Sequence, residues 1–107
     1  KLFQKNFSIA MMIDQRVTEG IRINFFNNYA YTTSIPAQLV KKFGCSIIPV
    51  HIERKNKIYF EITFEKPINF HENENLESIS QILNYWLERM ISKNPPQWIW
   101  SHNRWKL

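Results

Sequence analysis

The sequence predicts an α/β protein with a mixed, mainly parallel sheet flanked by helices. Three observations favour this class: a continuous apolar run at residues 8–13, strand-like segments on both sides of a short helical segment, and a long amphipathic helix after residue 75. The 107 residues are 44% hydrophobic and 15% aromatic, enough to build the core of one domain. We see no repeat or linker that would indicate a second domain.

The N-terminal part is expected to begin with a buried strand. The run SIAMMI at residues 8–13 is apolar throughout, which suits a central strand of a parallel sheet that is covered on both faces. Asp14, Gln15 and Arg16 follow it directly. Because ligand sites in open α/β sheets lie outside the carboxyl ends of strands, these three residues are a candidate site. A solvated turn is the alternative interpretation.

Residues 21 to 52 are expected to form a strand, a helix and a strand. The segment IRINFF, residues 21–26, alternates apolar and polar side chains as a half-buried strand does, and Asn27 and Asn28 then break it. A short helix is predicted from Ile35 to Phe43, with Ser34 as its N-cap and Gly44 at its end. The apolar run CSIIPVHI, residues 45–52, predicts the next strand.

The second half of the chain is expected to contain a hairpin and the longest helix. Residues 58–65 alternate strictly, which predicts a hairpin with the preceding strand. From Leu76 to Ile91 the apolar residues recur at helical spacing. Asn75 is a typical N-cap, and Pro95-Pro96 are typical of a helix end.

The composition favours an anionic partner and gives no support for a metal or a cofactor. The net charge is +5 with a pI near 9.5, which suits nucleic acid, acidic lipid headgroups or an acidic carrier protein. A single cysteine, Cys45, cannot form an internal disulfide, and two glycines cannot form a Gly-rich phosphate loop. The three histidines, His51, His71 and His102, lack the spacing of a zinc-binding helix.

The C-terminal segment NPPQWIWSHNRWK, residues 94–106, combines tryptophans with basic residues and contains no acid. Such a mixture could stack bases and contact phosphates in a nucleic-acid-binding module, or lie at an anionic membrane surface. It could also be structural, with Trp98 and Trp100 packed on the sheet and His102 and Arg104 solvated. Spacing alone favours the structural interpretation.

This C-terminal segment resembles the signature of the bacterial lipid A late acyltransferases, the lauroyl and myristoyl transferase family. In that family a proline, a glutamine, Trp-x-Trp and His-x-Arg-aromatic-Lys close the catalytic domain. Upstream, MMIDQR at residues 11–16 resembles the family's strand ending in Asp-Gln, residues 23–54 resemble its central block, and YFEITFEKPI at residues 59–68 resembles its hairpin strand. The chain differs at Asn27, where the family commonly has glycine, and at Ile35-Pro36.

The resemblance covers essentially the whole chain and implies a glycerolipid-acyltransferase-like fold within the lysophospholipid-acyltransferase-like superfamily. It also implies transfer of a fatty acyl group from acyl carrier protein to a phosphorylated glycolipid acceptor, Kdo-lipid IVA, in lipopolysaccharide biosynthesis. The enzyme would work on an anionic membrane surface, the cytoplasmic face of the bacterial inner membrane, without nucleic acid. The near alternative is a phosphatidylinositol mannoside acyltransferase that uses acyl-CoA, and the distant alternative is a small basic nucleic-acid-binding module.

Members of this superfamily use a His-x-x-x-x-Asp motif as the general base. The residue five positions after His51, His71 or His102 is Asn56, Leu76 or Leu107, so none of them starts such a motif. We therefore expect residues 1–107 to be the C-terminal part of a single acyltransferase domain. The motif and an N-terminal membrane anchor would then precede it, and the part alone would be inactive.

The resemblance also implies residue roles. No residue of this chain is expected to be catalytic or to bind a metal. The residues expected to bind substrate are Asp14, Gln15, Arg16, Arg22 and Arg104, with Arg16 and Arg22 as candidates for gripping phosphate. The residues expected to support the site are Trp98, Trp100, His102, Trp105 and Lys106.

Overall fold

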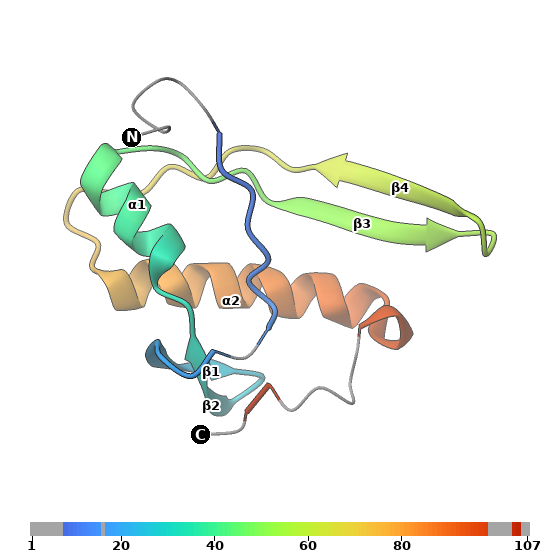
Figure 1. Cartoon of the computed structure of the whole chain (residues 1–107), viewed down its shortest axis with the longest axis horizontal. Coiled ribbons are helices and arrows are strands. Elements are labelled where there is room, and N and C mark those ends of the chain that lie inside the picture. Colours follow the sequence, from blue (N-terminus) through green and yellow to red (C-terminus); the bar gives the residue numbers. More distant parts are fainter. Residues whose placement is uncertain (1–7, 16, 99–103, 106–107) are drawn as a thin grey trace.

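The structure is a computed structural model that describes residues 8–15, 17–98 and 104–105. Its long helix crosses the molecule, a short helix lies over one end of it, and one hairpin lies on each side (Figure 1). In chain order the elements are β1 (Ile21–Phe25), β2 (Asn28–Thr32), α1 (Ile35–Phe43), β3 (Val50–Lys55), β4 (Tyr59–Phe64), α2 (Leu76–Lys93) and the 3-10 helix η2 (Pro95–Gln97).

The predicted mainly parallel sheet is wrong. The described residues form two separate two-stranded sheets, β1–β2 and β3–β4, and both are antiparallel. The run at residues 8–13 has no strand partner among the described residues and crosses the molecule as an irregular segment (Figure 1). Met12 is 81% exposed. A continuous apolar run indicates a buried strand only if neighbouring strands cover it, and here the neighbouring elements pair within their own hairpins.

The β1–β2 hairpin packs its inner face on α2. The predicted strand at residues 21–26 is confirmed as β1, and the chain then turns at Phe26 and Asn27, which have φ values of 51° and 63°. A two-residue turn with both φ values positive matches the twist of the paired strands. Asn28, expected to break the strand, begins β2 and pairs with Phe25.

Helix α1 forms where the sequence predicts it. Gly44 ends the helix with a φ of 65° and donates its backbone N–H to the Val40 carbonyl at 2.8 Å. This left-handed conformation favours glycine because a side chain would be strained there. Ser34 occupies the N-cap position, but its hydroxyl accepts a hydrogen bond from the Gln38 side chain at 2.7 Å instead of capping the helix.

Helix α2 carries the core of the molecule, and its predicted apolar stripe is confirmed. Asn75 caps the helix, because its Oδ1 accepts a hydrogen bond from the Ser78 backbone N–H at 2.8 Å. One half of the stripe packs with Ala37 and Val40 of α1, and the other half packs with Phe25 and Ala30 of β1–β2. The four buried apolar residues of the stripe are Ile79, Leu83, Leu87 and Ile91.

The β3–β4 hairpin is also confirmed, with strands that differ at their ends from the prediction. Strand β3 begins at Val50 and not at Cys45, and the preceding Ile47 makes only an isolated bridge to Ile68. The turn lies at Asn56 and Lys57, with φ values of 51° and 70°. The hairpin extends past the C-terminal end of α2 (Figure 1).

Candidate functional site

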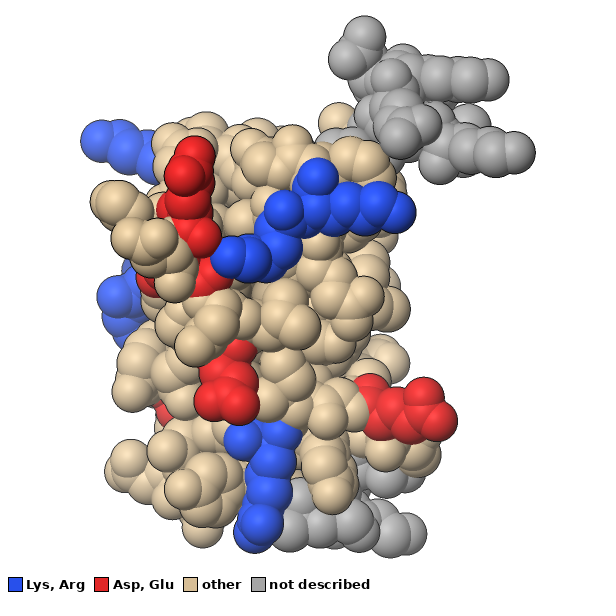
Figure 2. Space-filling view, turned by 90° about the vertical axis from the view of Figure 1, so that its left-hand side faces the viewer, with Lys and Arg blue, Asp and Glu red and all other residues tan. Residues whose placement is uncertain are grey.

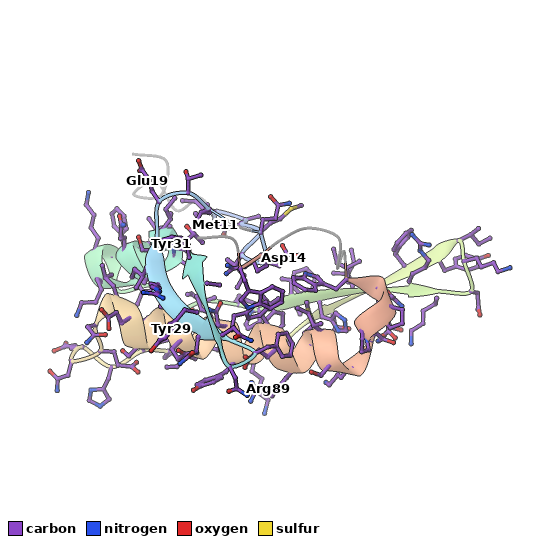
Figure 3. All side chains as sticks on the ribbon, turned by 90° about the horizontal axis from the view of Figure 1, so that it is seen from below. Met11, Asp14, Glu19, Tyr29, Tyr31 and Arg89 are labelled. Carbon is purple, nitrogen blue, oxygen red and sulfur yellow. The ribbon has the colours of Figure 1, made fainter. Side chains whose placement is uncertain are left out.

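Two of the predicted site segments, from opposite ends of the chain, meet beside the β1–β2 hairpin. The Asp14 carboxylate accepts a hydrogen bond from the Trp98 indole N–H, with 3.1 Å between Oδ2 and Nε1. Asp14 lies in the N-terminal segment beside the hairpin that carries Tyr29 and Tyr31 (Figure 3). Gln15 is exposed. Arg16, the third member of the predicted group, lies outside the described residues.

The tryptophans of the C-terminal segment form an aromatic cluster on Phe25. The Trp105 ring stacks on Phe25 with centroids 5.5 Å apart, and Trp98 meets Phe25 edge-on at 5.8 Å. The Trp105 indole N–H also donates to the Phe25 carbonyl at 2.9 Å. For Trp98, the structural interpretation of this segment is therefore confirmed. Trp100, His102 and Lys106 lie outside the residues that the structure describes.

Arg104, in the C-terminal segment, is completely buried against the β1–β2 hairpin. Its Nη1 donates to the Tyr31 carbonyl at 2.6 Å, its Nη2 donates to the Thr32 hydroxyl at 3.1 Å, and its guanidinium lies 5.2 Å from the centre of the Phe25 ring. Burial lowers the pKa of Arg104, and the nearby Asp14 carboxylate raises it in part. The expectation of a solvated Arg104 is wrong, because the Tyr31 carbonyl, the Thr32 hydroxyl and the Phe25 ring hold its guanidinium inside the protein.

The Thr32 hydroxyl joins Arg104 to helix α2. It accepts a second hydrogen bond, from Asn84 Nδ2 at 3.0 Å, and donates to the Ala30 carbonyl at 3.3 Å. Asn84 is fully buried and also contacts the Asn24 carbonyl. The sequence analysis missed Asn84, although a polar residue inside the apolar stripe of a helix is the signal that could have found it.

Arg22 does not join this cluster. It is exposed, and its guanidinium lies 4.8 Å from the centre of the Tyr29 ring, a cation–π contact. Successive side chains of a strand point to opposite faces, so Arg22 lies on the outer face of β1 while Phe25 faces the core. The role of Arg22 in phosphate binding stays a prediction, and the structure separates it from Asp14 and Arg104.

A basic groove lies between the base of β3–β4 and the C-terminal half of α2, with a volume of about 470 Å³. Three of its lining residues, Lys66, Arg89 and Lys93, are cationic, and none of the three has an acidic partner among the described residues. Trp86 and Met90 supply an apolar floor. The remaining lining residues are Pro49, His51, Glu65 and Ile68. Such a groove can bind an anionic molecule that also has an apolar part.

A second groove continues from the first around Arg89 and Lys93, which line both. On this side the backbone N–H of Phe26 donates to the Glu88 carboxylate, which ties the β1–β2 turn to α2. Figure 3 shows Arg89 on α2 near that turn. Arg89 and Lys93 are four residues apart and so share one face of the helix. This spacing is the signal from which the sequence could have predicted that the two cations lie side by side on α2.

Charge on another side of the molecule is mixed. Figure 2 shows the face at the α1 end, where basic and acidic side chains are interspersed among uncharged residues. A face of this kind offers no continuous basic patch to an anionic partner. The basic groove at the other end of α2 is therefore the better candidate for an anion site.

The described residues contain no group of three or more His, Cys, Asp or Glu side chains that could hold a metal ion. None of the helices in the described part of the chain is both long enough and apolar enough to cross a membrane.

Comparison with known protein families shows which family the chain belongs to. The family model for bacterial lipid A biosynthesis acyltransferases matches residues 1–107, the whole chain. A comparison with curated proteins found no match. The chain therefore belongs to the bacterial lipid A biosynthesis acyltransferase family, as its resemblance to the lipid A late acyltransferases predicts.

Proposed function

We propose that this member of the lipid A biosynthesis acyltransferase family forms the acceptor-binding side of an enzyme that acylates Kdo-lipid IVA, with acyl carrier protein as the acyl donor. Acyl transfer in lipid A biosynthesis follows from the family match over residues 1–107, which is the observation that carries the proposal. The donor and the acceptor come from the resemblance of the C-terminal segment to the late acyltransferases.

The reaction joins a fatty acyl group to a hydroxyl group of the acceptor. A general base takes the hydroxyl proton, the oxygen attacks the thioester carbonyl, and the thiol of the donor leaves. In this proposal none of the three histidines of the chain is the base, because none starts a His-x-x-x-x-Asp motif. The base then comes from such a motif in the sequence that precedes this part of the domain.

The acceptor has phosphate groups on a sugar core and long acyl chains, so its binding site needs cations beside an apolar surface. The basic groove supports this role, because Lys66, Arg89 and Lys93 lie at an apolar floor that includes Trp86 and Met90. The aromatic cluster around Phe25 and the buried Arg104 support a second role, which is to fix the C-terminal segment and Asp14 beside the groove-bearing helix.

The proposed partners are consistent with the charge of the chain. A net charge of +5 suits an acidic carrier protein and an anionic membrane surface, and the proposal places the enzyme on the cytoplasmic face of the inner membrane. Acyl transfer by the full-length protein should therefore be faster from acyl carrier protein than from acyl-CoA. Equal or greater activity with acyl-CoA and a phosphatidylinositol mannoside would favour the related acyltransferase instead.

The groove can be tested by kinetics of the full-length enzyme. The double change Arg89→Ala and Lys93→Ala should raise KM for the phosphorylated acceptor about 10- to 100-fold, because two phosphate-pairing charges are lost. Lys42→Ala, an exposed cation on α1, is the matched control and should leave KM unchanged. Equal KM values for the double variant and the control would contradict the assignment of the groove. An acceptor without phosphate should show no difference between the variants.

A further inference from the structure

The β3–β4 hairpin has one apolar face, and that face is exposed. Residues directly opposite each other in an antiparallel pair point to the same side, so Val50 shares a face with Phe64, and Ile52 shares it with Ile62. Phe60 continues the same face toward the turn, opposite Arg54. The exposure of the five apolar residues ranges from 40% for Val50 to 72% for Phe64. Large apolar patches on a protein surface mark interaction sites.

The other face of the hairpin is polar and is held toward α2 and η2. Glu53 accepts a hydrogen bond from the Asn94 side chain at 2.8 Å and lies 3.4 Å from the Lys55 ammonium. The strand edge is fixed as well, because the Arg54 backbone N–H donates to the Gln97 side chain at 2.9 Å. His51 on this face lines the basic groove. These contacts fix the orientation of the hairpin, so the apolar face points away from the described part of the protein.

The tip of the hairpin adds positive charge to exposed apolar side chains. Residues 54–60 contain three cations and no acidic residue. The cations are Arg54, Lys55 and Lys57. Ile58 and Tyr59 beside them are 74% and 65% exposed. The tip projects beyond the end of α2 (Figure 1). Apolar and aromatic side chains bordered by cations match the interface of an anionic bilayer, where chains and headgroups meet.

We propose that the apolar face and the basic tip of the β3–β4 hairpin insert into the headgroup region of an anionic bilayer. The inference rests on the proposed function in one respect only, that the acceptor is a membrane lipid. A bilayer matches both features. Its acyl chains can contact the apolar face, and its anionic headgroups can pair with the cationic tip. The basic groove is lined by His51 of the opposite face, so it stays outside the bilayer when the apolar face inserts.

An environment-sensitive fluorophore on the hairpin tests the proposal in the full-length protein, whatever else in that protein binds the membrane. Cys45, the only cysteine of this chain, is first replaced by serine. An NBD label is then attached through Ile62→Cys on the apolar face or, as a matched control, through Thr63→Cys on the polar face of the same strand. Vesicles of phosphatidylglycerol and phosphatidylethanolamine are added, with and without a nitroxide-bearing lipid as quencher.

The proposal expects the label at position 62 to shift to the blue, gain intensity and be quenched by the nitroxide lipid, while the label at position 63 changes little. Vesicles of phosphatidylcholine alone should give a much smaller change. Neutralising the tip with Arg54→Gln, Lys55→Gln and Lys57→Gln should weaken the response on the order of tenfold or more.

Three results would overturn the proposal. A label at position 62 that already emits in the blue without vesicles would mean that another part of the protein covers the face. A signal that depends on protein concentration and not on lipid would mean that a second copy covers it. Acyl transfer in detergent micelles is measured in parallel. An enzyme that is active but whose hairpin does not insert contradicts the hairpin proposal alone. A protein that transfers no acyl group to the proposed acceptor contradicts the proposed function.

Discussion

The Trp98 indole donates a hydrogen bond to the Asp14 carboxylate, although 84 positions separate the two residues in the chain. Each belongs to a motif of the family resemblance, Asp14 to the Asp-Gln segment and Trp98 to the C-terminal signature. The bond gives Asp14 a structural partner in addition to any role at the substrate. It also links two motifs that lie far apart in the sequence, and the strength of this link can be measured.

Removing this hydrogen bond should destabilise the protein, and the effects of changing Asp14 and Trp98 should not be additive. Asp14→Ala and Trp98→Phe should each lower the free energy of unfolding, because one loses the acceptor and the other loses the donor. A double-mutant cycle in urea should give a coupling energy of about 1 kcal/mol, the usual value for one hydrogen bond. Strictly additive single effects would show that the two residues act independently. Asp14→Asn keeps an acceptor oxygen and should cost less than Asp14→Ala.

The buried Arg104 predicts a larger effect. Arg104→Met should lower the free energy of unfolding by about 2–4 kcal/mol, because the Tyr31 carbonyl and the Thr32 hydroxyl both lose a donor inside the protein. The loss for Arg104→Lys should be smaller than for Arg104→Met but still measurable, since an ammonium lacks the planar fork of the guanidinium. Thermal unfolding of the purified variants measures the difference.

Arg22→Met is the matched control, because Arg22 is exposed and, among the described residues, its guanidinium makes a cation–π contact with Tyr29 and no ion pair. It should change the free energy of unfolding by less than about 1 kcal/mol. If Arg104→Met leaves the melting temperature unchanged and raises KM for the acceptor, Arg104 binds substrate directly, as the family resemblance implies.

The elements that the sequence predicts well are those whose signals are local. Helix α2 shows its apolar stripe, its Asn75 cap and its proline end within one segment, and the β3–β4 alternation is equally local. The parallel sheet was a different kind of prediction. The run at residues 8–13 is compatible with a central strand, but its partners must come from elsewhere in the protein, and a local pattern cannot say whether they are present.

The site was predictable only in part, for a similar reason. The resemblance identified Asp14, Trp98 and Arg104, but no spacing rule shows that residues so far apart in sequence touch. Strand β2 was missed because its buried face carries Ala30 and Thr32, which are small or polar. Thr32 is buried because Arg104 and Asn84 satisfy its hydroxyl, a long-range arrangement.

The cap of α2 gives a third prediction. Asn75→Ala should lower the free energy of unfolding by about 1 kcal/mol, because the Ser78 backbone N–H loses its acceptor at the start of the helix that carries the core. Asn73→Ala is the control, since Asn73 is exposed and forms no hydrogen bond among the described residues. Urea unfolding of both variants gives the comparison, and equal effects would contradict the capping role.

The contact between Glu53 and Asn94 predicts a pH dependence. The hydrogen bond from Asn94 is the largest cause that holds the pKa of Glu53 below its ordinary value of 4.5, the Lys55 ammonium adds to it, and partial desolvation opposes both. The pKa in the folded state is lower than in the unfolded chain. The stabilisation is therefore fully present above about pH 4.5 and is lost as the pH falls through the lower folded-state pKa.

Asn94→Ala should thus raise the pKa of Glu53 and make stability less dependent on pH in the acid range. An NMR titration of the Glu53 carboxyl group measures the first effect, and urea unfolding at acid and neutral pH measures the second. Lys55→Gln should shift the pKa in the same direction, because the Lys55 ammonium lowers the pKa both by hydrogen bonding and by its charge. A larger shift in Lys55→Gln would mean that the ion pair, and not the α2 end, holds the carboxylate. The polar face of β3–β4 would then be less firmly attached to α2 than the hydrogen bond implies.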